Sequence, residues 1–125
     1  SEALFFRIRS KSTQTAGERL FGLKDKQLGD TAFDERFVIE TQDTARLNEL
    51  LTQDLRRRIV DLEAERGVQV SLQNVKYFNG KAWVEEPRLN VAINMISTER
   101  QDYAALIDAV LSLYDRIKEI TKDNV

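Results

Sequence analysis

The spacing of the apolar residues changes abruptly at Gly67, and no other feature constrains the fold of this chain as strongly. From Asp43 or Thr44 to Arg66 the apolar residues lie three or four positions apart, which predicts one long amphipathic helix that Gly67 ends. Its apolar stripe consists of Leu47, Leu51, Leu55, Ile59 and Leu62. From Val68 on, the spacing is two, as in a half-buried strand. The chain must therefore combine helix with sheet.

The segments before this helix predict further strands. Leu4–Arg9 alternates between apolar and other side chains, and Arg19–Lys24 is a shorter candidate. Between them, Ser10–Gly17 has the small polar residues of an exposed loop. Thr31–Asp43 predicts a turn followed by a strand from about Arg36 to Thr41.

Asn79-Gly80 joins two extended segments and predicts a hairpin with a two-residue loop. The expected cross-strand pairs are Phe78 with Lys81, Tyr77 with Ala82, Lys76 with Trp83, and Val75 with Val84. We expect one face of the hairpin to turn toward the core, namely Val75, Tyr77, Ala82 and Val84. The opposite face consists of Lys76, Phe78, Lys81 and Trp83. Pro87 is expected to interrupt pairing before a last strand with Leu89, Val91, Ile93 and Met95.

A second long helix is expected to start at Thr98-Glu99-Arg100-Gln101, which has the form of a capping box. Its apolar stripe consists of Tyr103, Leu106, Val110, Leu113, Ile117 and Ile120, and Ile107, Leu111 and Tyr114 widen it. A stripe of this width serves a two-layer core, and its regular spacing also suits helix pairing. We expect the core to take it and keep a dimer contact as the alternative.

Together these elements predict an α+β two-layer sandwich. Its antiparallel sheet has about five to six strands, and the two long helices lie on one face, in the order β-β-β-α-β-β-β-α. The 125 residues suffice for one domain, residues 1–125, and not for two cores of ordinary size. The abrupt start, with a strand almost at Ser1, favours a fragment of a longer protein.

The amino-acid composition excludes several kinds of catalytic and metal-binding site. The chain has no Cys and no His, which excludes thiol catalysis, disulfides, imidazole acid–base chemistry and zinc sites built on these residues. No Ser-x-x-Lys is present to activate a serine. The net charge of −2 offers no general attraction to nucleic acid or to anionic lipid. We therefore expect no catalytic residues and no cofactor.

Two charged clusters need an interpretation. Asp30, Asp34 and Glu35 could together hold a hard cation, but they lack the dense oxygen ladder of a calcium loop. Turn formation and backbone capping explain them better, and metal binding remains the alternative. The run 56–58 is three Arg residues that span about 200° of a helix, too wide for one docking face. Ion pairs of Arg58 with Asp54 and of Arg57 with Asp61 are expected instead.

The face made of Lys76, Phe78, Lys81 and Trp83 is the main candidate binding surface, because basic and aromatic side chains alternate on it. Exposed Trp and Phe serve as anchors for protein partners. The same combination can stack nucleic-acid bases and hold phosphates, although the acidic background argues against it. If a helix or loop covered Trp83, this face would instead belong to the core.

The segment Phe6-Arg7-Ile8-Arg9, followed by Leu28-Gly29-Asp30 and Phe33-Asp34-x-x-Phe37-Val38, resembles the soluble domain of a loose group of bacterial and archaeal proteins without an established activity. Members share a Gly-Asp-x-x-Phe-Asp-x-x-Phe-x-Val segment before a helix, a strand pair and a final helix. The resemblance covers about two thirds of the chain and is strongest between Leu28 and Leu62. Members often have transmembrane helices on the N-terminal side, which implies a cytosolic domain of a membrane-anchored protein.

These observations predict a non-catalytic domain that binds another protein or a second copy of itself. Contact with a membrane is expected only through segments absent from this chain. The alternatives are a metal-dependent domain or small enzyme that uses Asp30, Asp34 and Glu35, and a nucleic-acid-binding module that uses the residue 76–83 hairpin.

Overall fold

The computed structural model describes residues 3–11, 25–63, 67–93 and 100–122. The elements in chain order are β1 (Phe6–Ser10), α1 (Thr31–Arg36), β2 (Phe37–Thr41), α2 (Thr44–Leu50), α3 (Gln53–Glu63), β3 (Val68–Phe78), β4 (Trp83–Ile93) and α4 (Arg100–Lys122). The α+β class expected from the sequence is confirmed.

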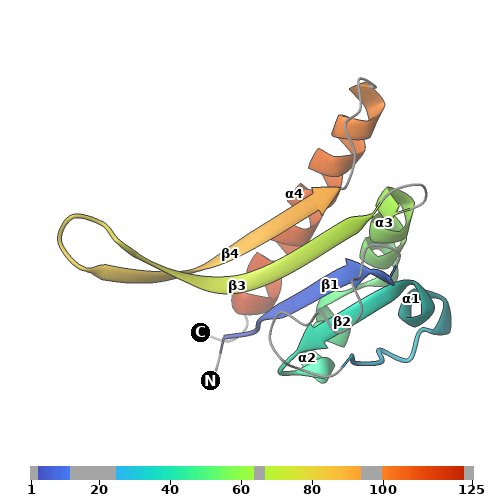
Figure 1. The fold of residues 1–125 in the computed structure, drawn as a ribbon, viewed down its shortest axis with the longest axis horizontal. Helices are drawn as coiled ribbons and strands as arrows, with labels where there is room; N and C mark the ends of the chain where they lie inside the picture. Colours follow the sequence, from blue (N-terminus) through green and yellow to red (C-terminus); the bar gives the residue numbers. More distant parts are fainter. Residues whose placement is uncertain (1–2, 12–24, 64–66, 94–99, 123–125) are drawn as a thin grey trace.

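The strands form one antiparallel sheet in the order β2-β1-β3-β4 (Figure 1). Ile8 lies opposite both Ile39 and Val70, which places β1 between β2 and β3. The outer edge of β2 is covered by the preceding segment, where Lys26 N–H donates to the Ile39 carbonyl and the Asp25 carboxylate accepts from Ile39 N–H. The other edge strand is β4.

The core lies between one face of this sheet and helices α2, α3 and α4. Alternate strand residues face the helices, among them Phe6, Ile8, Phe37, Ile39, Val68, Val70 and Leu72. The helices contribute Leu47, Leu50, Leu51, Leu55, Ile59, Leu62, Ala109 and Leu113. All of these side chains are buried. The described elements therefore form the two expected layers, and the period-two and helical stripes meet between them.

The strand count and order differ from the prediction. The described part of the chain has four strands, not five to six, mainly because the two strands predicted before and after Pro87 are one strand, β4, of 11 residues. Pro87 does not interrupt pairing: it lies opposite Asn74 within β4. An edge strand tolerates proline because the missing N–H can be on the side without a partner strand. The predicted strand Arg19–Lys24 and Met95 lie outside the described residues.

The predicted first long helix is two helices. Asp43 caps α2, accepting from Arg46 N–H at 3.1 Å, but the helix ends at Leu50. Thr52 then accepts from Leu55 N–H at 3.3 Å at the start of α3. All five residues of the predicted stripe are nevertheless buried, so the stripe correctly identified the core side. Residues 64–66, which precede the expected end at Gly67, are not among those described.

Helix α4 confirms the second predicted helix, although Thr98 and Glu99 of its expected capping box lie outside the described residues. Its inner side packs on the core through Leu106, Ala109, Leu113, Ile117 and Ile120. The residues that were expected to widen the stripe, Ile107, Leu111 and Tyr114, are exposed. None of the described helices is long and apolar enough to span a membrane.

Candidate functional site

The β3–β4 hairpin turns through four residues, not two. Asn79 N–H donates to the Ala82 carbonyl at 3.1 Å, and the Asn79 side-chain oxygen accepts from Lys81 N–H at 2.9 Å and Ala82 N–H at 3.0 Å. Gly80 has φ +97°, a conformation that glycine adopts without a steric penalty. The Asn-Gly signal thus located the turn correctly. The predicted register was wrong by two residues, because the side chain of Asn79 organises a wider loop.

In the observed register Phe78 lies directly opposite Trp83, and Lys76 lies opposite Glu85. The Phe78 and Trp83 rings contact each other with centroids 5.7 Å apart and planes inclined by 55°. Lys81 is in the turn and not on the strand face. Three of the four predicted face residues, Lys76, Phe78 and Trp83, therefore share a face, and the fourth is adjacent to it in the turn. We call these four residues the aromatic tip.

The aromatic tip is on the opposite side of the ribbon from the one expected. Side chains alternate along β4, so Trp83 shares the face of Leu89, which packs on the core. Val75, Tyr77 and Val84 thus occupy the other face, and the expectation that they face the core is wrong. Trp83 is exposed because β3 and β4 extend beyond the helices, not because it is on the outer face.

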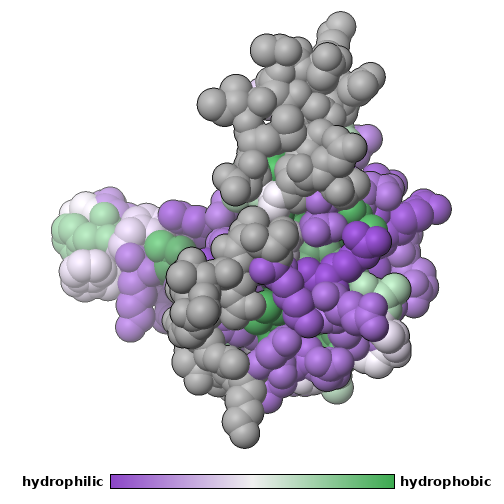
Figure 2. Space-filling model, turned by 45° about the vertical axis from the view of Figure 1, so that its right-hand side comes forward, coloured by the Kyte–Doolittle hydropathy of each residue, from purple (hydrophilic) through white to green (hydrophobic). Residues whose placement is uncertain are grey.

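The hairpin projects well away from the rest of the sheet (Figure 1). β1 pairs with β3 only between Gln69 and Leu72, so from Gln73 outward β3 pairs with β4 alone among the described strands. Trp83 is 75% exposed and Phe78 is 56% exposed. Figure 2 shows hydrophobic atoms gathered at the projecting end of this ribbon. The aromatic tip is therefore accessible from several directions.

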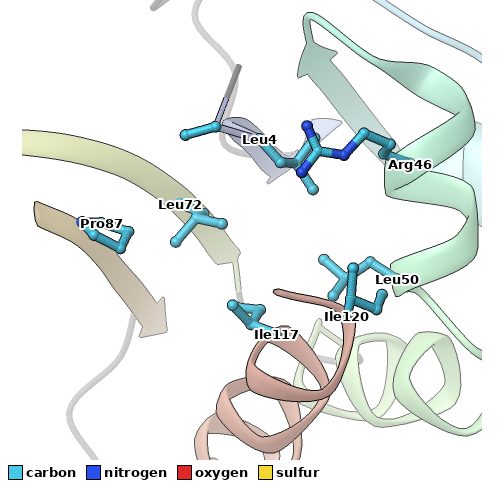
Figure 3. Close-up of a pocket in the computed structure, with 8 residues that line it drawn as sticks. Leu4, Arg46, Leu50, Leu72, Pro87, Ile117 and Ile120 are labelled. Atoms are coloured by element: carbon cyan, nitrogen blue, oxygen red, sulfur yellow. The ribbon is translucent and has the colours of Figure 1, made fainter. Parts of the chain in front are cut away.

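An apolar pocket lies at the base of the hairpin, between the start of β1, α2, and the end of α4 (Figure 3). Its volume is about 130 Å³, and it is lined by Ala3, Leu4, Arg46, Leu50, Leu72, Pro87, Ile117 and Ile120. Pro87 is on the same face of β4 as Trp83, four residues away. The aromatic tip and this pocket are therefore parts of one side of the ribbon.

Two of the three acidic residues considered for metal binding bond to the backbone of their own segment. The buried Asp34 carboxylate accepts from Leu28 N–H at 3.0 and 3.1 Å and from Gly29 N–H at 3.1 Å. Asp30 caps α1, accepting from Phe33 N–H. Glu35 is exposed. Within the described ranges, no group of three or more acidic residues is arranged to hold a metal ion.

Arg56 is the polar residue whose role was missed. It is 7% exposed, and its Nε donates to the Leu51 carbonyl at 2.9 Å. Its other nitrogens donate to Asp30 at 3.2 Å and to the side chain of Asn48. The guanidinium also lies 5.9 Å from the centroid of the Phe33 ring. A signal was present, because Arg56 is next to Leu55 and three residues before Ile59 on the core side of the helix.

The other two Arg residues of the run behave as surface residues. Arg57 and Arg58 both pair with Asp54, at 2.8 and 2.9 Å. The predicted pair of Arg58 with Asp54 is confirmed, whereas Arg57 pairs with Asp54 and not with Asp61. The hydrogen bond from Arg58 lowers the pKa of the Asp54 carboxyl below its ordinary value. Arg57 and Arg58, both paired with Asp54, do not form a basic docking face.

Comparisons with known proteins place no further constraint on the site. The chain matches no protein-family model, and neither the curated proteins nor the solved structures contain a significant match.

Proposed function

We propose that this protein is a non-catalytic binding domain that docks on a protein partner through the aromatic tip. The observation that carries the proposal is that Trp83 is 75% exposed although its ring contacts the ring of Phe78. Leaving large aromatic surface in water forgoes the stabilisation that burial provides, about 25 cal/mol per Å². An exposed pair of this kind on a projecting ribbon is typical of an interaction anchor.

The surroundings of the tip support a protein partner over nucleic acid. Lys76 lies opposite Glu85, and both line the same shallow hollow beside Trp83, so the local positive charge is partly balanced. Single-strand binding normally relies on a continuous basic groove beside the stacking rings. A protein surface requires only the aromatic anchor and a few polar groups around it.

The cellular setting is part of the proposal. A cytosolic position in a membrane-anchored protein is supported by the resemblance between the Gly29–Val38 segment and the bacterial and archaeal group described above. In that setting the tip would reach a partner at a distance from the body of the domain.

Photo-crosslinking tests the proposal directly. A benzophenone amino acid is placed at position 78, and, as the matched control, at position 88. Arg88 is exposed on β4 but belongs to the opposite face of the ribbon. In cells that express the natural partner, position 78 should give a discrete protein adduct that Trp83→Ala abolishes, and position 88 should not.

Two outcomes would contradict the proposal. One is an adduct pattern that is the same from both positions. The other is tight binding of a single-stranded oligonucleotide that quenches Trp83, the only Trp of the chain, which would make the nucleic-acid alternative correct.

A further inference from the structure

The outer side of α4 has a second apolar surface, separate from the aromatic tip. Tyr103, Ile107, Leu111 and Tyr114 are 45%, 56%, 54% and 52% exposed. Their spacing of four, four and three places them in a row along one side of the helix, beside the residues that pack on the core. The first turns of α4 extend past the end of the sheet (Figure 1), and the exposures show that the whole row is accessible.

Lys118 continues the row by one more turn. Its ammonium nitrogen is 5.2 Å from the centroid of the Tyr114 ring, a cation–π distance. Within the described residues no ion pair involves Lys118. We call the five residues Tyr103, Ile107, Leu111, Tyr114 and Lys118 the α4 row.

The α4 row is self-complementary about Leu111. When a second α4 is laid antiparallel with Leu111 beside Leu111, Ile107 of each copy meets Tyr114 of the other. The same alignment brings the Lys118 ammonium of each copy to the Tyr103 ring of the other, a cation–π contact that forms twice. A parallel alignment would place the two Lys118 ammonium groups side by side, which is repulsive. The position of Lys118 therefore favours the antiparallel orientation.

We propose that the α4 row is a two-fold symmetric, antiparallel contact between two copies of this chain. Four half-exposed side chains offer on the order of 400 Å² of apolar surface per copy, the size of the largest apolar patch on a typical monomer, which is often functional. Stable dimers bury about 800 Å² per partner, so this contact is a weak, concentration-dependent one. The occupant of the α4 row is a second α4, and the aromatic tip stays free for another partner.

Sedimentation velocity over about 5 to 500 μM tests the proposal, since a contact of this size should dissociate within that range. The apparent mass should rise with concentration from the 14.4 kDa of one chain toward twice that value. Ile107→Glu and Leu111→Glu should weaken association at least about tenfold. Ala105→Glu, at an exposed position on another side of α4, is the matched control and should associate like the unaltered chain.

Cysteine crosslinking tests the orientation, because the chain has no Cys of its own. Leu111→Cys, at the two-fold axis, should form a covalent dimer with a short thiol-reactive crosslinker. Tyr103→Cys should not, because an antiparallel pair separates the two positions by about 24 Å at 1.5 Å per residue. Mixing Tyr103→Cys with Lys118→Cys should restore crosslinking between unlike copies.

Clear results would overturn the proposal. An unaltered chain that stays monomeric over the whole range, even if another protein binds α4, rules out the second copy as occupant. Crosslinking of Tyr103→Cys to itself rules out the antiparallel orientation. Trp83→Ala should leave self-association unchanged, so the failure of the proposed function would not be confused with failure of the α4 contact.

Discussion

The Arg56 guanidinium connects three segments of the chain. It contacts the residue that caps α1, a side chain of α2 and the carbonyl just after α2. Arg116 of α4 donates to the Glu49 and Leu50 carbonyls at the same helix end. Helix α2 has only seven residues, too short for independent stability. Two cations at its C-terminus supply partners for carbonyl groups that a helix end leaves unpaired.

Replacing Arg56 should therefore destabilise the fold. We expect Arg56→Ala to lower the free energy of unfolding by about 2–4 kcal/mol, because it leaves buried acceptors without a donor. Arg57→Ala, whose ion pair is exposed, should change it by less than about 1 kcal/mol. Urea unfolding followed by circular dichroism measures both. Equal effects of the two substitutions would show that Arg56 is not the internal connection described.

Trp83 should behave as a surface residue in the isolated domain. Its fluorescence should be red-shifted and readily quenched by acrylamide, because three quarters of the side chain is in contact with water. Trp83→Ala should cost less than about 1 kcal/mol of stability, mainly the contact with Phe78. Phe33→Ala, at a buried ring, should cost about 3–5 kcal/mol. A blue-shifted spectrum, or a loss at position 83 as large as at position 33, would contradict the exposed position.

Two leucines of one helix, two residues apart, distinguish the two sides of α4. Leu113 is buried and Leu111 is half exposed. Leu113→Ala should lower the free energy of unfolding by about 2–4 kcal/mol, and Leu111→Ala by less than about 1 kcal/mol. Thermal or urea unfolding at low micromolar concentration measures the effects on the monomer. Similar losses at both positions would mean that the outer side of α4 is also packed.

Helices and strands were predicted correctly where the spacing of apolar residues alone determines them. The predictions were wrong where a side-chain hydrogen bond ends or starts an element. β1 and the second long helix follow from periodicity, and β2 was located from the apolar residues that begin at Phe37. The segment before β2 was expected to be a turn and is instead the short helix α1, which Asp30 caps. The break between α2 and α3 does not, because the Thr52 hydroxyl starts a new helix without disturbing the spacing of the stripe. The two-residue shift in the hairpin has the same origin, since Asn79 closes the turn with its side chain.

At the scale of the whole molecule, stability should decrease along the hairpin. The inner ladder, where β3 also pairs with β1, belongs to the core, whereas the outer ladder has no described strand beside it except its partner. Amide hydrogen exchange should be slow at residues 68–72 and at those amides of residues 89–93 that bond to β3, and much faster at residues 74–78 and 83–86. Uniform protection along both strands would indicate that another surface covers the outer ribbon.

The overall class was predictable because the two hydrophobic periods require a sheet against helices. The number of strands was not, because segment ends depend on pairing: Pro87 is compatible with a strand only at an edge, and sequence alone does not show which strand is at the edge. The aromatic tip was found as a set of residues, but its exposure has a different cause from the one inferred. That cause, the length of β3 and β4 relative to the helices, becomes evident only in the assembled fold.

The length of the ribbon also has a mechanical consequence. A partner that pulls on the tip along the strand direction displaces β3 and β4 in the same direction. The hydrogen bonds between these two strands therefore carry little of the load. The load passes to the β1–β3 ladder from Phe6–Leu72 to Arg9–Gln69, where the hydrogen bonds are strained in shear and resist simultaneously. A pull across the ribbon would instead peel the outer pairs apart one after another. The hairpin should therefore resist tension along the strands better than tension across them.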